Sequence, residues 1–576
     1  MPSFYLTRAE ILTNNISPVT LDNASSTTQL ELEKTTPLSI SQCTPAFTGY
    51  IEQYVAPSEL AFSPLFTNAT AIIEKYLKLP VPLLLVNSRY WLNAQQVLKE
   101  VIPNDLPVDY LLSYNQESLF GRASLNADDT LHLSQGLLNT FNNGALVLNI
   151  SPLLVESNLW FKLKSVLQRG YLLASDAVNA DKSKQALPDL QSQPINIKLI
   201  LVASRAQLEE LIQIDPEYTQ ISSLFCELAS QVPVNQTSIN TVIHYCQHLA
   251  AQLGLTPLND KALQIILNAL SIECQHQQQL LFDLEFIEQT IRYANLFTEN
   301  KRVTEDDLSA YFDEINEAQS LARKYSEQSV IEGQVNLQLT GEKIGQINGL
   351  SVVELLGYPC EFGEVFRISA SDMIGDGEII DVERKVELAG NIHAKSTHIV
   401  QGYLNHFFSH ISAFPYSCNL VFEQSYQESD GDSASLAILL AVSSCYAKCA
   451  VKQDVFVTGS LDQHGNVLPI GGINQKIESV SRLFELGLLT DPVTIVMPKA
   501  NMLNLTLNKY SLALIEEGKL LIHAINHCHQ AFPILLNKSF EQIIKTINCR
   551  IELANKEEME ESSIGLFSRL KHSIFH

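Results

Sequence analysis

The stretch "ESDGDSASLAILLAVSS", residues 428–444, limits the possible fold more than any other part of this chain. Its second half is a run of apolar and small residues, with no charged residue before Lys448. A helix that is apolar on every face is stable only inside a protein, so the run predicts the central helix of a domain. The preceding "DGD" favours a tight turn, in which Gly431 adopts backbone angles that other residues avoid. The serines therefore stand at the mouth of a buried helix, where they serve either packing or chemistry.

The chain has 576 residues, which is too many for a single hydrophobic core and predicts several domains. Three buried runs, 82–88, 144–151 and 197–204, alternate with segments of helical periodicity, a pattern typical of a parallel α/β sheet. The strand pattern then disappears, and apolar residues recur at i, i+3, i+4 and i+7 up to about residue 325. Thr304 is the expected N-cap of one helix in this helical region.

Strands punctuated by glycine return after about residue 330, together with predicted helices over 396–412, 433–449 and 472–487. This mixture predicts a compact α+β domain near the C-terminal end. The sequence thus predicts a multidomain protein of the α/β and α+β classes. Its expected parts are an N-terminal segment (1–60), an α/β domain (61–205), a helical domain (206–325), an α+β domain (326–530) and a C-terminal tail (531–576).

The charge balance disfavours several classes of function. With 38 Lys and Arg against 63 Asp and Glu, the formal net charge is −25, which repels nucleic-acid phosphates and anionic lipids. The longest apolar runs are shorter than the ~20 residues of a spanning helix, and the first residues lack the pattern of a signal peptide. The ten cysteines form no CxxC pair, which favours reduced thiols. We therefore expect a cytoplasmic protein that binds neither membranes nor nucleic acid.

Ser433 is a candidate nucleophile because it stands at the predicted first turn of the buried helix. The unpaired amides of that turn favour developing negative charge, so they can hold the oxyanion formed when a serine attacks a carbonyl. Such a serine needs a base, and Lys476 lies on a second apolar helix after Gly471 and Gly472. Burial disfavours the charged ammonium, so this lysine can accept the serine proton. Taken alone, Ser433 is more simply a helix cap and Lys476 part of a solvated face.

Other polar residues in this region have simpler interpretations. Ser435 fits as a small packing residue, and His464 fits in the hairpin turn "HGN". Histidines and a cysteine also gather in "HAINHCHQ", residues 523–530, but without the glutamate of an HExxH zinc motif. We interpret that group as ordinary surface or core residues: His523, His527, Cys528 and His529.

The motifs "DGDSAS" and "TGSL…GNVLPIGGINQKI" together resemble the proteolytic domain of the Lon family, in particular its B-type group of Ser-Lys dyad peptidases. Further matching segments occur upstream in the family's order, including "FGEVFRISA", "GEIIDVERKVELAGNIHAKS" and "FEQSY", so the resemblance spans about 200 residues. It implies a Lon-type α+β peptidase domain with Ser433 as nucleophile and Lys476 as general base. It also implies that Asp430, Asp432 and Thr458 give the dyad polar support.

Lon enzymes usually couple the peptidase to an AAA+ ATPase, whose phosphate loop GxxxxGK[ST] cradles phosphate with backbone amides. At the corresponding place this chain reads "LLLVNSRYWLNAQQ", without a glycine or a Gly-Lys pair. Where two carboxylates are expected, the chain has Asn149 and Ile150. The resemblance therefore implies a degenerate AAA+-like α/β domain followed by a helical lid domain. We expect no required cofactor, and any binding of ATP would have to occur without recognisable Walker motifs.

These inferences predict a serine endopeptidase of Lon type that cleaves unfolded or poorly structured polypeptides without productive ATP hydrolysis. The resemblance also implies a homo-oligomeric ring, a hexamer in the family, with the active sites facing an inner chamber. Two alternatives stay open. One is an ATP-dependent Lon protease with a divergent nucleotide site, which nucleotide binding would favour. The other is a non-catalytic Lon-shaped binding or scaffold module, which DNA binding would favour.

Overall fold

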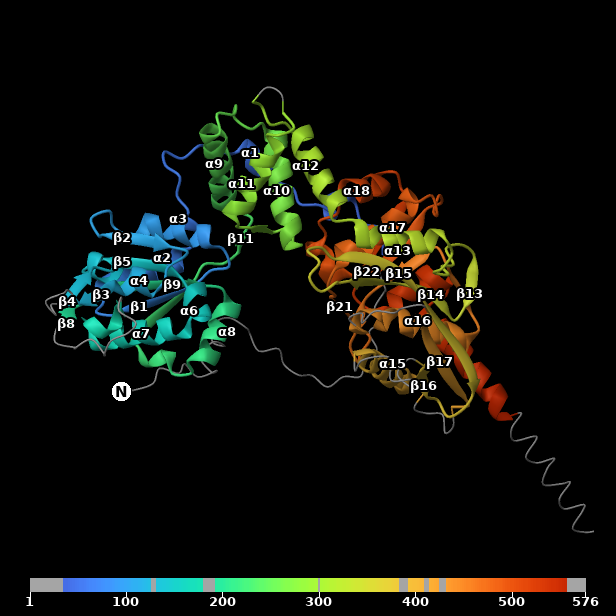
Figure 1. The fold of residues 1–576 in the computed structure, drawn as a ribbon. Helices are drawn as coiled ribbons and strands as arrows, with labels where there is room; N and C mark the ends of the chain where they lie inside the picture. The colour runs from blue at the N-terminus through green and yellow to red at the C-terminus, as the bar shows by residue number, and fades with distance from the viewer. Residues whose placement is uncertain are drawn as a thin grey trace, which may run out of the picture.

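The fold is described from a computed structural model for residues 35–125, 131–179, 192–298, 301–382, 392–408, 414–423 and 431–556. Figure 1 shows three bodies, with a helical body between an α/β body and a larger α+β body. All ten cysteines lie in the described residues, and none forms a disulfide, as the sequence predicted. Among the same residues, no helix is both long and apolar enough to cross a membrane.

The α/β body is built on a five-stranded parallel sheet with the strand order β10-β1-β9-β5-β2. The three buried runs expected from the sequence are confirmed as β1 (Leu83–Asn87), β5 (Ala145–Asn149) and β9 (Lys198–Ala203). The two outer strands, β2 (Val108–Leu111) and β10 (Ser223–Glu227), are only partly buried. Because β10 pairs with β1, the sheet extends past the expected domain boundary at residue 205.

Helices cover both faces of this sheet, as a parallel sheet requires. Alternate strand residues enter two separate cores, one shared with α2, α3 and the helical body, the other with α4 to α8. The helices are α2 (Thr67–Lys78), α3 (Trp91–Val101), α4 (Gln116–Phe120), α5 (Leu137–Thr140), α6 (Ser151–Val155), α7 (Ser157–Arg169) and α8 (Arg205–Ile214). Short strands beside them are β3 (Arg122–Leu125), β4 (Leu131–Ser134), β6 (Tyr171–Leu173), β7 (Val178–Asn179) and β8 (Ser192–Pro194).

The helical body follows and keeps the expected helical periodicity. Thr304 is confirmed as a helix cap, because its Oγ1 accepts a hydrogen bond from the backbone N–H of Asp307 at 3.4 Å. The elements are α9 (Gln236–Gln252), α10 (Asp260–Cys274), α11 (Leu284–Ala294), α12 (Glu305–Ala318) and a small antiparallel pair, β11 (Gln231–Pro233) and β12 (Gln279–Leu281).

The described part of the N-terminal segment joins the helical body to the α+β body. Its short helix α1 (Thr48–Glu52) packs against α9 and α10 and buries Ile51 in their core. A few residues earlier, the backbone N–H of Leu38 donates to the carbonyl of Ile522 at 2.8 Å, in the α+β body. Residues 35–52 therefore contact two bodies that come much later in the sequence.

The α+β body contains a seven-stranded sheet with the strand order β16-β17-β15-β14-β19-β22-β23. Strands β14, β19, β22 and β23 are parallel, so their carboxyl ends share one edge, and the antiparallel β15 begins at that edge. The strands are β14 (Gln346–Val353), β15 (Phe362–Ile374), β16 (Ile379–Asp381), β17 (Tyr416–Glu423), β19 (Val455–Val457), β22 (Val493–Pro498) and β23 (Leu520–Ile525). Two small pairs flank the sheet: β13 (Glu342–Ile344) with β18 (Ala450–Lys452), and β20 (Ser460–Leu461) with β21 (Val467–Leu468).

The predicted central helix is confirmed as α16 (Ser435–Ala447), in which every residue is buried. It shares one face of the sheet with α15 (Ile392–Phe408) and α19 (Ala531–Leu536), while α17 (Ile473–Glu485) and α18 (Lys509–Glu516) cover the other face. Residues 540–556 are also helical. Four of their apolar side chains complete the core around α16, so this body extends past the expected boundary at residue 530: Phe540, Ile543, Ile547 and Ile551.

Candidate active site

Ser433 lies at the carboxyl edge of the large sheet. It belongs to η5 (Gly431–Ala434), a 3-10 turn directly before α16, and not to the first α-helical turn that the sequence predicted. Its carbonyl accepts hydrogen bonds from the backbone N–H of Gly459 at 2.8 Å and from Thr458 Oγ1 at 3.4 Å. Since these two residues directly follow β19, the bonds fasten the mouth of α16 to the end of that strand. Ser433 is 9% exposed, so it is buried but still within reach of solvent.

The expected supporting residues fall into two groups. Thr458 is fully buried, and its hydroxyl supports Ser433 through the carbonyl bond. Asp432 acts in two ways: its carbonyl accepts a hydrogen bond from Ser435 Oγ at 2.7 Å, and its carboxylate forms an ion pair with Lys395. The bond from Ser435 tightens the 3-10 turn, which is why α16 begins later than expected. Asp430 lies outside the described residues.

Sequence reasoning did not single out Lys395, which stands near the start of α15. Its ammonium reaches the carboxylate of Asp432, one residue before Ser433, across a separation of 37 residues. The only signal in the sequence was its place inside "GEIIDVERKVELAGNIHAKS", a segment that resembles the Lon family. The pair adds a positive charge beside the turn that carries Ser433.

Lys476 lies in the first part of α17 and is 3% exposed, so its predicted burial is confirmed. The helix begins after the β20–β21 hairpin, and its N-cap Gly472 has φ 61°, a left-handed conformation that favours glycine. A side chain at Gly472 would come within 2.4 Å of Val352 Cγ2. The start of α17 is therefore held against the end of β14.

The structure places Ser433 and Lys476 at the same edge of the sheet. Strands β14 and β19 are adjacent and parallel, with Gly349 opposite Val457. The residues that follow, Val352 on β14 and Thr458 after β19, therefore lie at one carboxyl edge. Helices α16 and α17 start at this edge and cover opposite faces of the sheet. The carboxyl edge of parallel strands is the usual position of a binding site in α/β sheets.

A network of partly buried charges fixes α17. The helix α13 (Leu321–Ile331), which follows the helical body, carries Glu327, and Arg482 Nε lies 2.8 Å from a carboxylate oxygen of this residue. The same guanidinium donates to the carbonyl of Gly363 at 2.9 Å, at the start of β15. Burial lowers the pKa of Arg482 and raises the pKa of Glu327. Glu327 pairs with Arg482 on α17 and also with Arg323 on its own helix, so this network ties α13 to the helix of Lys476.

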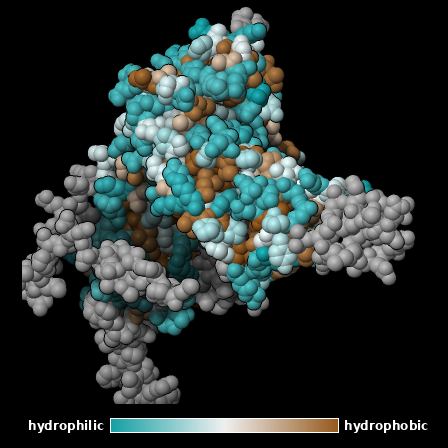
Figure 2. All heavy atoms as spheres, turned by 90° about the vertical axis from the view of Figure 1, so that its left-hand side faces the viewer, coloured by the Kyte–Doolittle hydropathy of each residue, from teal (hydrophilic) through white to brown (hydrophobic). Residues whose placement is uncertain are grey.

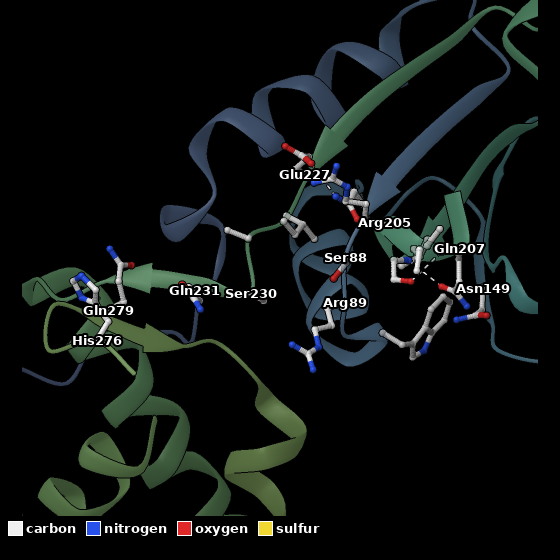
Figure 3. Close-up of a pocket in the computed structure, with 18 residues that line it drawn as sticks. Ser88, Arg89, Asn149, Arg205, Gln207, Glu227, Ser230, Gln231, His276 and Gln279 are labelled. Carbon is white, nitrogen blue, oxygen red and sulfur yellow. Dashed lines mark hydrogen bonds between the residues drawn. The ribbon is translucent and has the colours of Figure 1, made fainter. Parts of the chain in front are cut away.

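A large cavity of about 1230 Å³ opens at the carboxyl edge of the other sheet, in the α/β body. Figure 3 shows Arg89, Asn149 and Arg205 on the side of that body, with His276 and Gln279 from the helical body across the opening. This cavity lies beside the connection from β1 to α3, where the resemblance to AAA+ modules implies a phosphate loop.

The chain around this cavity does not provide a phosphate loop. Only Ser88 to Tyr90 separate β1 from α3, and Ser88 Oγ donates to the carbonyl of Tyr90 at 2.9 Å. A loop that wraps phosphate needs a longer, glycine-rich turn and a lysine. At the end of β5, Asn149 Oδ1 accepts from the backbone N–H of Ser151 at 2.9 Å, so this amide caps its own chain. These residues do not fit a Mg²⁺-nucleotide held in the AAA+ manner.

The class of protein is a serine peptidase whose α+β body follows an AAA-like part. Residues 326–536 match the family model of the Lon protease (S16) C-terminal proteolytic domain, and residues 106–228 match the LonB-like AAA domain.

Comparison with known proteins identifies the family. The chain is 32% identical over 449 residues to a Lon protease homolog of Escherichia coli (strain K12), covering 77% of this chain and 76% of the relative. It is 31% identical over 468 residues to a Lon protease homolog of Haemophilus influenzae, covering 79% and 77% of the two chains. An archaeal Lon protease of Pyrococcus abyssi is 32% identical over 166 residues, or 29% and 15% of the two chains. The chain belongs to the Lon protease family.

Proposed function

We propose that this protein is an endopeptidase that cleaves unfolded or poorly structured polypeptides through Ser433 and Lys476, without productive ATP hydrolysis. The observation that carries the proposal is the common position of the two residues. Both are buried at the start of a helix, and both helices begin at the carboxyl edge formed by β14 and β19. A buried lysine without a full charge is a suitable base for a serine hydroxyl.

The proposed reaction is acyl transfer. Neutral Lys476 takes the proton of Ser433 Oγ as the oxygen attacks the peptide carbonyl, and the backbone amides at Asp432 and Ser433 hold the oxyanion. The lysine then gives this proton to the leaving amine, and an ester links Ser433 to the acyl part of the substrate. Water attacks the ester with Lys476 again acting as base, which releases the carboxylate and restores the hydroxyl.

A cavity of about 510 Å³ beside α17 supports a polypeptide substrate. It is bounded by α13, by β14 and β15, and by α17, and Val352 and Gly363 at its border also contact the first turn of α17. Apolar side chains line much of it, including Tyr325, Val330 and Leu483. Unfolded polypeptides expose hydrophobic side chains, which can pack against this apolar lining. The cavity can therefore hold such a polypeptide next to the edge that carries Ser433 and Lys476.

The full chain is expected to hydrolyse casein and fluorogenic peptides in buffer from which apyrase has removed nucleotide. Adding ATP and Mg²⁺ should leave the rate unchanged, because the connection from β1 to α3 lacks a phosphate loop. Arg89→Ala, which removes a cation from the cavity wall, serves as control and should cleave like the unaltered chain. ATP-stimulated turnover, or micromolar nucleotide binding by calorimetry, would show an ATP-dependent protease with a divergent site. DNA binding without any cleavage would show a non-catalytic module.

The proposal includes assembly into a homo-oligomeric ring, with a hexamer as the expected size. Large apolar side chains are exposed on all three bodies, for example Val155 at 90%, Leu296 at 76% and Ile374 at 92%. Figure 2 shows hydrophobic side chains between hydrophilic ones on the face that carries the α/β body. Burial of such side chains between subunits would favour association. Mass photometry of the full chain measures the ring size, and a monomer at micromolar concentration would contradict this part.

A further inference from the structure

A second cluster of reactive side chains lies beside the β20–β21 hairpin and takes no part in the proposed reaction. It consists of His527, Cys528 and His529. Each of these residues offers one metal-binding atom, and the three atoms lie within 4.8 Å of one another. His527 caps the short 3-10 turn η7 (Cys528–Gln530), which follows β23. The sequence alone indicated ordinary core or surface residues, because no zinc motif is present. The geometry shows three potential ligands facing one another.

The ring of His527 is oriented as in a metal site. Its Nε2 lies 3.1 Å from the backbone carbonyl of His464, and because a carbonyl only accepts, Nε2 carries the proton. Nδ1 therefore keeps its lone pair, which accepts a hydrogen bond from the backbone N–H of His529 at 3.3 Å and lies 3.9 Å from Cys528 Sγ. A metal ion would replace this backbone amide as the partner of Nδ1. Histidines that bind metals typically donate their other ring N–H to a carbonyl or carboxylate in this way. The backbone thus fixes the tautomer that a metal ion requires.

A fourth polar atom completes the cluster. The hydroxyl of Tyr403, on α15, lies 3.3 Å from Cys528 Sγ and 2.8 Å from His529 Nε2. Cys528 is fully buried and Phe540 stacks on the ring of His529, whereas both histidines are partly exposed to solvent. The centre of the cluster is thus shielded, and an ion has an entry path past the histidines.

We propose that His527, Cys528 and His529 bind a transition-metal ion of the zinc class, with water or the Tyr403 hydroxyl at the fourth position. Two imidazoles and a thiolate are ligands that suit zinc. Bond lengths of about 2.0–2.3 Å place tetrahedral ligand atoms about 3.4–3.6 Å apart, so these side chains need to close in by ~1 Å. Binding forms a metal–sulfur bond, releases the thiol proton to solvent and changes no oxidation state.

Such an ion would stabilise the β20–β21 hairpin and α15, which lie next to the candidate active site. The backbone N–H of Cys528 donates to the carbonyl of Gly465 in the hairpin at 2.9 Å, and Tyr403 belongs to α15. The hairpin connects Thr458 to α17, while α15 carries Lys395, the ion-pair partner of the residue before Ser433. The metal would therefore link the two elements on which the candidate active site depends, without entering that site.

The test is a titration of the full chain, free of any affinity tag and stripped of metal by a chelator, with Co²⁺ as a spectroscopic substitute for zinc. We expect one Co²⁺ per chain, a thiolate-to-cobalt band in the near ultraviolet, and loss of the band when Zn²⁺ displaces the cobalt. Cys528→Ser should abolish the band. His527→Gln should weaken Co²⁺ binding by about tenfold or more.

Cys549→Ser is the matched control, because this exposed cysteine lies on the C-terminal helix and should leave the titration unchanged. The absence of a band from the unaltered chain, or an undiminished band in Cys528→Ser, would overturn the proposal. Far-ultraviolet circular dichroism checks that the variants fold. If Cys528→Ser does not fold, His527→Gln decides the question, and unchanged Co²⁺ affinity in that variant would contradict the site.

Discussion

Ser433→Ala is expected to lower kcat for peptide cleavage by about 10⁴-fold or more, because alanine lacks the hydroxyl that attacks the peptide carbonyl. Lys476→Met keeps the apolar stem of the buried side chain but removes the base, and should lower kcat by about 10²–10⁴-fold. Since the two residues act as one unit, the double variant should be no slower than Ser433→Ala alone. Steady-state cleavage of a fluorogenic peptide measures all three, with KM expected to change little.

Ser443→Ala provides a matched control in α16, the buried helix that directly follows Ser433. Its hydroxyl is buried and has no hydrogen-bond partner among the described residues, so its removal should leave both activity and stability intact. The substitution is chemically identical to Ser433→Ala and lies ten residues later on α16. If both alanine variants cleave peptide at the unaltered rate, Ser433 is not the nucleophile. If both lose activity equally, the loss reflects damage to α16 and not missing chemistry.

Local sequence pattern was enough to predict the most buried elements. The all-apolar run predicted α16, and three short apolar runs predicted β1, β5 and β9. Elements that are buried on every side consist of continuous apolar residues, which are easy to recognise in the sequence. Strand β10 was missed because it is a half-exposed edge strand, whose side chains follow no continuous apolar pattern. The C-terminal residues 540–556 were assigned to a tail because their apolar side chains join the core only through tertiary packing.

The candidate site divides in the same way. Ser433 and Lys476 could be found from short motifs, since each follows a glycine turn that opens a buried helix. Contacts between segments that are distant in the sequence could not be found from short motifs. Lys395 reaches Asp432 across 37 residues, and Tyr403 reaches Cys528 across 125 residues. No local periodicity records such pairs, because they depend on how α15 packs against the hairpin and the sheet.

Gly363, at the start of β15, lies against the backbone of α17, and a substitution at this contact should have a large effect on stability. A Cβ at this residue would lie 2.0 Å from the carbonyl oxygen of Gln475 and 3.0 Å from the amide nitrogen of Lys476. Both atoms belong to the backbone of α17 and cannot rotate away, so the start of the helix must move. We expect Gly363→Ala to lower the free energy of unfolding by about 3 kcal/mol, the upper end of the usual range for overpacking.

Activity should fall further than stability alone explains, because the helix that moves carries the proposed base. A displacement of about 1 Å at a reacting group costs about 10²-fold in rate, so the folded fraction of Gly363→Ala should show a kcat lower by about that factor. The control is Gly402→Ala on α15, where nothing lies within 4 Å of an added Cβ and alanine should stabilise the helix by about 0.5–1 kcal/mol.

Urea unfolding can assign the damage to one body. Both tryptophans, Trp91 and Trp160, belong to the α/β body, so their fluorescence follows that body, while far-ultraviolet circular dichroism follows the whole chain. In Gly363→Ala the fluorescence transition should stay in place, and part of the circular dichroism transition should move to lower urea. A variant that unfolds and cleaves like the unaltered chain would mean that α17 tolerates displacement. Lys476 would then not need the fixed position that the proposed mechanism gives it.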